Sequence, residues 1–144
     1  MTARRAESLA RFWQERIPFN RECGFVVTHW DDDRVRMEVD DAVVLSNGVG
    51  SIHGGVIATL IDTVANAAAI PLDEWTADSQ IVTVSMTVHY TGPARGRLVA
   101  DAACARRGRS LTSVSVDVHD TDGALVAHGV VVVKVSAGAV PDPT

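Results

Sequence analysis

The segment Asn47-Gly48-Val49-Gly50-Ser51-Ile52-His53-Gly54-Gly55-Val56-Ile57-Ala58-Thr59-Leu60-Ile61-Asp62 does the most to decide how this chain folds. It joins a polar loop to a His-Gly-Gly triplet and then to an apolar run, which continues until Pro71 stops it. The run is rich in alanine and isoleucine and predicts a helix over residues 54–70 that is apolar on nearly every side. We expect this helix to be buried, and a sheet curled around it would bury it.

The same segment carries two features that suit acyl chemistry. Gly54 and Gly55 let a ligand approach the first turn of the helix, where N–H groups without internal partners favour negative charge. Such a helix end can hold a developing oxyanion. Asp62 interrupts the apolar run, and an ionised carboxylate in apolar surroundings is costly unless it is paired. Alternatively, Asp62 belongs to a polar stripe with Thr59 and Asn66.

A first helix is predicted over residues 3–17 and ends at Pro18. In most of the remaining chain, apolar and polar residues alternate with a period of two, which is typical of strands. Strands are predicted over residues 25–30, 35–39, 81–90, 96–105, 114–118 and 125–135. In the third of these, one face carries Val82, Val84, Met86, Val88 and Tyr90, and the other carries Thr83, Ser85, Thr87 and His89. Consecutive antiparallel strands with one long helix indicate an α+β domain.

Composition narrows the function classes. The chain has 144 residues and is 47% hydrophobic, which fits one domain with a real core, and its net charge of −5 argues against general nucleic-acid binding. Cys23 and Cys104 form neither a metal pattern nor a disulfide framework, so we expect free thiols. No apolar stretch follows Arg4-Arg5, and no run approaches the ~20 residues of a membrane helix. We therefore expect a cytoplasmic protein without a signal peptide.

One basic cluster stands out on this acidic chain. Five arginines fall between residues 95 and 109, against the single acid Asp101; they are Arg95, Arg97, Arg106, Arg107 and Arg109. The cluster reads either as one anion-binding patch or as the solvated ends of two strands.

The chain resembles the hotdog-fold acyl-CoA thioesterases, and within them the PaaI-like enzymes of phenylacetic acid degradation. The resemblance covers roughly residues 23–135 and rests on the spacing of Asn47, His53-Gly54-Gly55, Asp62, Thr83, Tyr90-Thr91-Gly92-Pro93-Ala94 and the Arg-Gly-Arg turn before Ser110. It implies a curled antiparallel sheet around one long central helix. We expect an extra N-terminal helix in residues 1–22, the thioesterase domain in 23–136 and a tail in 137–144.

The resemblance also implies roles for individual residues. Asp62 would be the general base or nucleophile, and the Gly54 N–H would polarise the thioester carbonyl. His53 would orient this loop, Asn47 would hold the carbonyl or the attacking water, and Thr83 would position water near the carboxylate. Coenzyme A would contact the segments that contain Gly55, Tyr90, Pro93, Ala94, Arg95, Arg106, Arg107, Gly108, Arg109 and Ser110.

Several of these residues can also be explained by a structural role alone. His53 can simply cap the helix. Asn47 before Gly48 suits a turn, and Thr83 is a good strand residue in any case. No set of His, Cys and carboxylate side chains has a recognisable metal spacing, so no metal or redox cofactor is expected.

Helix geometry gives an argument that is independent of the family. Asp62 lies eight residues after Gly54 and therefore ~12 Å further along one helix. A base and an oxyanion donor must both lie close to the reacting centre. Two antiparallel copies of the helix can bring Gly54 of one chain to Asp62 of the other. The sequence thus predicts a homodimer with shared sites, or a tetramer built from two such dimers.

The predicted function is hydrolysis of an acyl- or aryl-CoA thioester. One alternative is an enoyl-CoA hydratase or dehydratase on the same fold, which would use a His and a carboxylate as an acid–base pair. The other is a non-catalytic acyl-CoA-binding module, which would keep the pocket without the carboxylate. The sequence leaves the acyl group and the biological pathway open.

Overall fold

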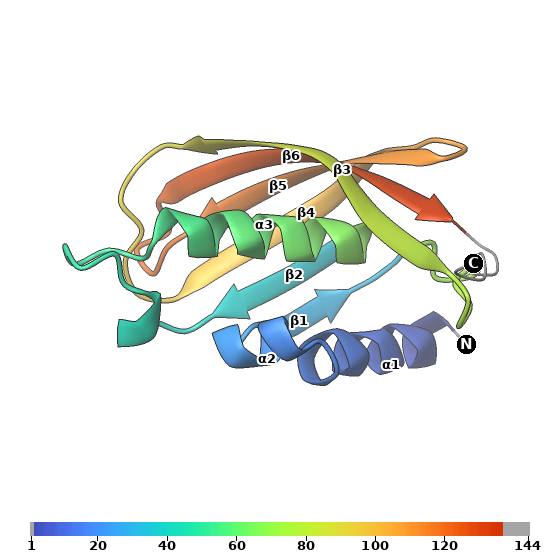
Figure 1. Cartoon of the computed structure of the whole chain (residues 1–144), viewed down its shortest axis with the longest axis horizontal. Coiled ribbons are helices and arrows are strands. Elements are labelled where there is room, and N and C mark those ends of the chain that lie inside the picture. Colours follow the sequence, from blue (N-terminus) through green and yellow to red (C-terminus); the bar gives the residue numbers. More distant parts are fainter. Residues whose placement is uncertain (1, 137–144) are drawn as a thin grey trace, which may run out of the picture.

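One long helix lies across the concave face of a six-stranded antiparallel sheet in the computed structural model, which describes residues 2–136 (Figure 1). The helix, α3 (Gly54–Ala68), ends two residues earlier than predicted. The strands are β1 (Val26–Trp30), β2 (Arg34–Val39), β3 (Gln80–Tyr90), β4 (Leu98–Arg107), β5 (Leu111–His119) and β6 (Leu125–Ser136). Their order in the sheet is β1-β2-β4-β5-β6-β3, so β3 forms one edge.

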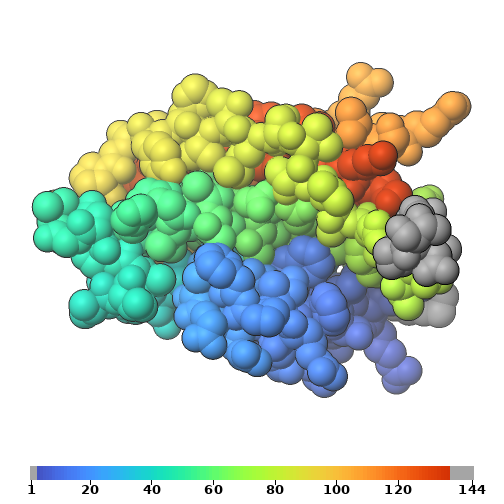
Figure 2. Space-filling view, viewed as in Figure 1, coloured from blue at the N-terminus to red at the C-terminus, as the bar shows by residue number. Residues whose placement is uncertain are grey.

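The N-terminal segment packs on the same core as the sheet. It forms α1 (Thr2–Glu15) and a short second helix, α2 (Pro18–Cys23). The second helix was not predicted, because Pro18 was expected to end a helix, whereas proline also suits the first position of a helix. Trp13 is buried on α1 and meets Trp30 edge-on, with ring centroids 5.8 Å apart. The space-filling view shows α1 and α2 covering one side of α3 and leaving a strip of it visible (Figure 2). The predicted boundary at residue 22 is thus not a break in packing.

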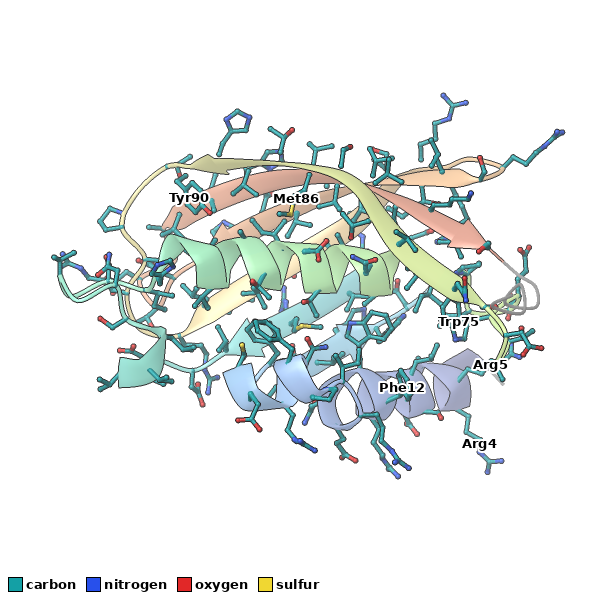
Figure 3. The ribbon with its side chains drawn as sticks, in the orientation of Figure 1. Arg4, Arg5, Phe12, Trp75, Met86 and Tyr90 are labelled. Atoms are coloured by element: carbon teal, nitrogen blue, oxygen red, sulfur yellow. The ribbon has the colours of Figure 1, made fainter. Side chains whose placement is uncertain are left out.

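β3 carries a bulge directly after Thr83, where its register against β6 shifts by one residue. Thr83 pairs with Val133 before the bulge and Met86 pairs with Val131 after it, and both valines are buried. Thr83 therefore shares the inner face with Met86 and Tyr90, which lie between the sheet and α3 (Figure 3). The prediction that Thr83 faces away from these two residues is wrong. It assumed regular alternation along the strand, and the extra residue of the bulge reverses the faces after Thr83.

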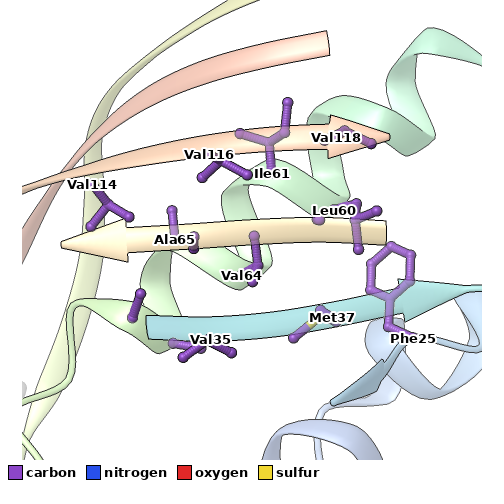
Figure 4. Packing of buried hydrophobic residues seen from close by; sticks show 14 of the residues in the cluster. Phe25, Val35, Met37, Leu60, Ile61, Val64, Ala65, Val114, Val116 and Val118 are labelled. Atoms are coloured by element: carbon purple, nitrogen blue, oxygen red, sulfur yellow. The ribbon is translucent and has the colours of Figure 1, made fainter. Parts of the chain in front are cut away.

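The core confirms the prediction that α3 is largely buried. Leu60, Ile61 and Val64 are 0% exposed. They pack with Ala65 against valines of β5, residues of β2 and Phe25 (Figure 4). The face of α3 with Thr59 and Asp62 is only half-buried, which leaves one polar strip open along an otherwise apolar helix. None of the helices in residues 2–136 is long and apolar enough to cross a membrane.

The loop between β2 and α3 contains one short helical turn, η1 (Val43–Leu45), within the loop predicted over residues 42–52. The predicted tail, residues 137–144, lies outside the described residues.

Candidate active site

α3 and β3 bring Asp62 and Thr83 together. The Thr83 hydroxyl donates to Asp62 Oδ1 over 2.6 Å, and Asn66 Nδ2 donates to the same oxygen over 3.1 Å and to Thr83 Oγ1 over 2.9 Å. Asn66 lies one turn after Asp62 on α3, and its amide also donates to the Asp62 backbone carbonyl over 2.7 Å. Within residues 2–136 no donor pairs with Asp62 Oδ2. One carboxylate oxygen is thus held in place, and the other remains open to accept a proton.

Asn66 is the residue that sequence reasoning left without a role in the site. It appeared only as a member of a possible polar stripe. Its spacing of four residues from Asp62 was the available signal, because side chains at i and i+4 are neighbours on a helix. The link to Thr83 could not be seen in the sequence, because it depends on the β3 bulge that turns Thr83 inward.

His53 caps the N-terminus of α3. Its ring Nδ1 accepts the Gly55 backbone N–H over 2.9 Å, and the His53 backbone N–H donates to the Leu45 carbonyl over 2.8 Å. A Cβ on Gly55 would lie 3.0 Å from His53 Nδ1, so a larger residue would disturb the cap. An Nδ1 that accepts this bond carries no proton, which gives His53 a positioning task at the helix start.

Tyr90 holds the first residue of α3 in place. Its hydroxyl donates to the Gly54 carbonyl over 2.7 Å, and a Cβ on Gly54 would lie 3.4 Å from the Tyr90 ring. No acceptor within residues 2–136 pairs with the Gly54 N–H. The helix therefore begins with a fixed N–H that is available to a ligand oxygen.

Asn47 organises the loop that precedes this helix start. Its Oδ1 accepts the N–H groups of Val49 and Ser51 over 2.9 and 3.3 Å, and its Nδ2 donates to Ser51 Oγ over 2.7 Å. Gly48 and Gly50 have φ angles of +83° and +88°, which side chains disfavour. This geometry matches the reading of Asn47 as a turn residue, and a direct contact with substrate stays a prediction.

The residues expected to contact coenzyme A form two groups at opposite ends of α3. Residues 90–95 lie beside the N-terminal end, where the Ile52 N–H donates to the Ala94 carbonyl over 2.9 Å. Residues 106–110 lie beside the C-terminal end, where Arg107 reaches the last carbonyls. A helix of 15 residues separates these ends by about 20 Å. The reading of the arginine cluster as one continuous patch is therefore wrong for a single chain.

Arg107 has a structural task at the end of α3. Its guanidinium donates to the Ala69 carbonyl over 2.5 Å and to the Asp32 carbonyl over 3.1 Å, which joins the helix end to the β1–β2 turn. A cation at a helix C-terminus also suits the helix dipole. By contrast, Arg106 and Arg109 are exposed and form no ion pair within residues 2–136. These two guanidinium groups are therefore open to an anion.

The cysteines offer no reactive thiolate. Both are free, as predicted, and burial raises the pKa of the Cys23 and Cys104 thiols. A raised pKa leaves little thiolate at neutral pH. No three metal-ligating side chains gather within residues 2–136. Among the side chains that α3 and β3 bring together, the Asp62 carboxylate has an oxygen open for proton transfer or attack.

Comparison with known proteins places the chain in a family. The model of the thioesterase superfamily matches residues 49–127, which is more than half of the chain and includes α3 and the strand with Thr83. A Halobacterium salinarum protein, provisionally named an esterase, is 33% identical over 98 residues, which are 66% of this chain and 65% of that protein. Acyl-coenzyme A thioesterase 13 of the mouse is 32% identical over 58% of this chain and 60% of its own length. The match therefore spans slightly less than two thirds of these relatives.

Solved structures agree with this assignment. The AziG protein of S. sahachiroi is 32% identical, with a TM-score of 0.72 over 81% of this chain and 94% of that one. A thioesterase family protein of Silicibacter pomeroyi has a TM-score of 0.82 over 96% of this chain and all of its own, and at 20% identity it supports the fold alone. With its curled sheet, its central helix and a family match that runs through both, this chain belongs to the thioesterase superfamily and has the hotdog fold.

Proposed function

We propose that this chain hydrolyses the thioester bond of an acyl- or aryl-CoA to a free acid and coenzyme A. The observation that carries the proposal is the Asp62 carboxylate, which Thr83 and Asn66 hold by one oxygen and leave open at the other. Membership of the thioesterase superfamily and the likeness to acyl-coenzyme A thioesterase 13 support the same reaction. No metal or redox cofactor takes part in it.

The reaction needs two proton transfers, to Asp62 and from it, and one stabilised oxyanion. Asp62 Oδ2 takes a proton from water as the water oxygen attacks the thioester carbon. The Gly54 N–H donates to the oxyanion of the tetrahedral intermediate, and His53 and Tyr90 keep this N–H in place. The C–S bond then breaks, and the proton on Asp62 passes to the thiolate sulfur. In the alternative route, Asp62 attacks directly and water hydrolyses the resulting anhydride.

A working site requires two chains in this proposal. Gly54 and Asp62 lie on one continuous helix with ~12 Å between them, so one chain cannot bring both to one carbonyl. β3 is an edge strand, and its Val82 and Val84 side chains are 59% and 55% exposed. A second copy that pairs with this edge would continue the sheet and set two α3 helices antiparallel. The same dimer would bring Arg95 of one chain toward residues 106–110 of the other.

The geometry favours hydrolysis over the hydratase reaction. A hydratase would use His53 and a carboxylate as an acid–base pair, whereas within residues 2–136 the His53 ring bonds to the Gly55 N–H and to no carboxylate. The non-catalytic alternative is disfavoured because Asp62 is present and has an unpaired oxygen. The cytoplasmic location stays a prediction.

Replacing Asp62 by Asn tests the proposal, because Asn keeps the shape and removes the base. We expect thiol release from acyl-CoA to fall by roughly 10²–10⁴, while the melting temperature stays unchanged or rises. Asp78→Asn, at an exposed position after α3, is the matched control and should keep full activity. An enoyl-CoA hydration assay is run in parallel. Near-normal thioester turnover in Asp62→Asn, or hydration without thiol release in the wild type, would refute the assignment.

A further inference from the structure

The loop before α3 contains the only asparagine of the chain that is followed by a glycine. Asn20 and Asn66, the other two asparagines, are buried and precede larger residues. Asn47 is exposed and precedes Gly48, in a loop that projects from one end of the molecule (Figure 1). An asparagine before a glycine can react with its own backbone, because the glycine nitrogen has no Cβ beside it to hinder attack on the side-chain amide. The product is a succinimide, which water opens to aspartate or isoaspartate.

The nitrogen that would attack lies beside a proton acceptor. The Gly48 N–H donates to Ser46 Oγ over 3.1 Å, and this nitrogen must lose its proton when it forms the new bond. Ser46 is exposed, so its own hydroxyl proton can pass to water as it takes the proton from Gly48. Gly48 has a φ of +83°, and no atom lies within 4 Å of the point where a Cβ would stand. Gly48 thus offers an uncrowded nucleophile with an oxygen placed to take its proton.

The side-chain amide of Asn47 is held as an electrophile. Its Oδ1 accepts the N–H groups of Val49 and Ser51 over 2.9 and 3.3 Å. The bond from Val49 closes a ring that contains both Asn47 Cγ and the Gly48 nitrogen, so the side chain is folded over the backbone that would attack it. Two N–H groups on one carbonyl oxygen are also the arrangement that stabilises a tetrahedral oxyanion. The loop therefore already holds the donors that the intermediate needs.

The leaving nitrogen of Asn47 has a hydroxyl beside it. Asn47 Nδ2 donates to Ser51 Oγ over 2.7 Å, and this hydroxyl carries a proton of its own. The nitrogen needs one more proton to leave as ammonia, which Ser51 can supply and regain from water. The Asn47 backbone N–H also donates to the Ser51 carbonyl over 2.9 Å, which closes the loop and keeps these groups together. Nucleophile, oxyanion donors and leaving-group acid thus surround one amide.

We propose that Asn47 is a self-modification site, at which the loop converts its own asparagine to a succinimide and then to aspartate or isoaspartate. The Gly48 nitrogen forms a bond to Asn47 Cγ, the bond from Cγ to Nδ2 breaks, and ammonia leaves. Water then adds to one of the two imide carbonyls and opens the ring. Water is the only co-reactant, and no atom changes its oxidation state.

The modification lowers turnover at the candidate active site. This consequence rests on the proposed function and on the expected contact of Asn47 with the thioester carbonyl or the attacking water, whereas the modification itself does not. Aspartate brings a negative charge to a carbonyl that must become an oxyanion. Isoaspartate adds a methylene to the main chain inside the loop that Asn47 and Ser51 close. Either product gives the enzyme a lifetime that its own loop sets.

Incubation of the folded protein at neutral pH and physiological temperature tests the chemistry. Peptide mapping by mass spectrometry measures the fraction of Asn47 converted, and enzymatic methylation of the same peptide measures isoaspartate. The reference is the full chain unfolded in guanidinium chloride, which keeps the Asn-Gly pair and loses the loop contacts. We expect conversion to be about tenfold faster in the folded chain, because positioned donors and acceptors lower the barrier.

Two serine variants test the proton transfers. Ser46→Ala removes the acceptor of the Gly48 N–H, and Ser51→Ala removes the hydroxyl beside the leaving nitrogen. Each should slow conversion in the folded chain by about threefold to tenfold, because water replaces a positioned hydroxyl only in part. Neither should change the rate in guanidinium chloride. Ser8→Ala, at an exposed position on α1, is the matched control and should convert at the wild-type rate. Thermal unfolding checks that all three variants are folded.

Separating the modified chains tests the consequence for turnover. Opening of the succinimide adds a negative charge, so ion exchange separates converted from unconverted protein. In an acyl-CoA hydrolysis assay, kcat/KM of the converted fraction should be at least about tenfold lower. If the unconverted protein hydrolyses no acyl-CoA, the proposed function fails, and the mass measurement still decides on the modification.

Two results would overturn this proposal. Conversion that is no faster in the folded chain than in guanidinium chloride, or that responds to neither serine variant, would show that the loop does not promote the reaction. Full activity of the converted fraction would show that the modification does not control turnover.

Discussion

Tyr90 shows how one side chain can hold the backbone of another candidate site residue. Tyr90 was expected among the coenzyme A contacts, and its hydroxyl donates to the Gly54 carbonyl. If it fixes the oxyanion donor, Tyr90→Phe should lower kcat by about tenfold and leave KM unchanged, because the lost interaction acts in the transition state. Steady-state kinetics with one acyl-CoA measure both constants. A rise in KM at constant kcat would instead support the coenzyme A contact.

At the residue scale, the sequence indicated which side chains lie together better than it indicated where they point, and their roles in the reaction stay predictions. A carboxylate such as Asp62 stands out in an apolar helix, and Thr83 lies next to it, where its hydroxyl donates to Asp62 Oδ1. The expected role of Thr83 in positioning water stays a prediction. Asn66 and the inward turn of Thr83 were missed, because both depend on a bulge that leaves no mark in a run of alternating residues. The sequence also did not show that Asn47 holds its own loop together or that Arg107 binds the end of α3. The partners of such side chains are decided by the folded structure.

The elements themselves were mostly predictable. The alternation of apolar and polar residues predicted the six strands, and the long apolar run predicted α3. The observed ends of these elements differ from the predicted ones by a few residues. α2 was missed because a helix of six residues carries too short a pattern. The order of the strands in the sheet could not be derived, because it depends on which inner faces meet α3.

Substitutions of Arg107 and Arg109 should separate an effect on the stability of the fold from an effect on ligand binding. Arg107 caps α3 and joins it to the β1–β2 turn, so Arg107→Ala should lower the melting temperature, by an amount equivalent to about 1–2 kcal/mol. Arg109 is exposed and unpaired within residues 2–136, so Arg109→Ala should raise KM for acyl-CoA without changing stability. Thermal unfolding and kinetics on both variants check this. A short thioester without the nucleotide is the control substrate, and its KM should not respond to Arg109→Ala.

At the scale of the whole molecule, mixing two inactive variants tests the shared site. In an equal mixture of Asp62→Asn and Asn47→Ala chains, random pairing makes half of the dimers heterodimers. If Asp62 and Asn47 of one site come from different chains, each heterodimer has one intact site, and activity recovers to about a quarter of wild type. If both residues of a site come from one chain, mixing restores nothing. Mass spectrometry of the intact dimers confirms that subunits have exchanged.

β3 holds both the first residue and the middle of α3, and this arrangement matters only in the assembled enzyme. Near one end of the strand Thr83 holds Asp62, and at the other end Tyr90 holds Gly54. In the proposed dimer, this Asp62 and this Gly54 serve different sites, so one strand anchors the base of one and the oxyanion donor of the other. If substrate displaces either anchor, the displacement would act on the strand that both sites share. Turnover at one site would then depend on occupancy of its twin, and the rate would follow a cooperative rather than a hyperbolic curve.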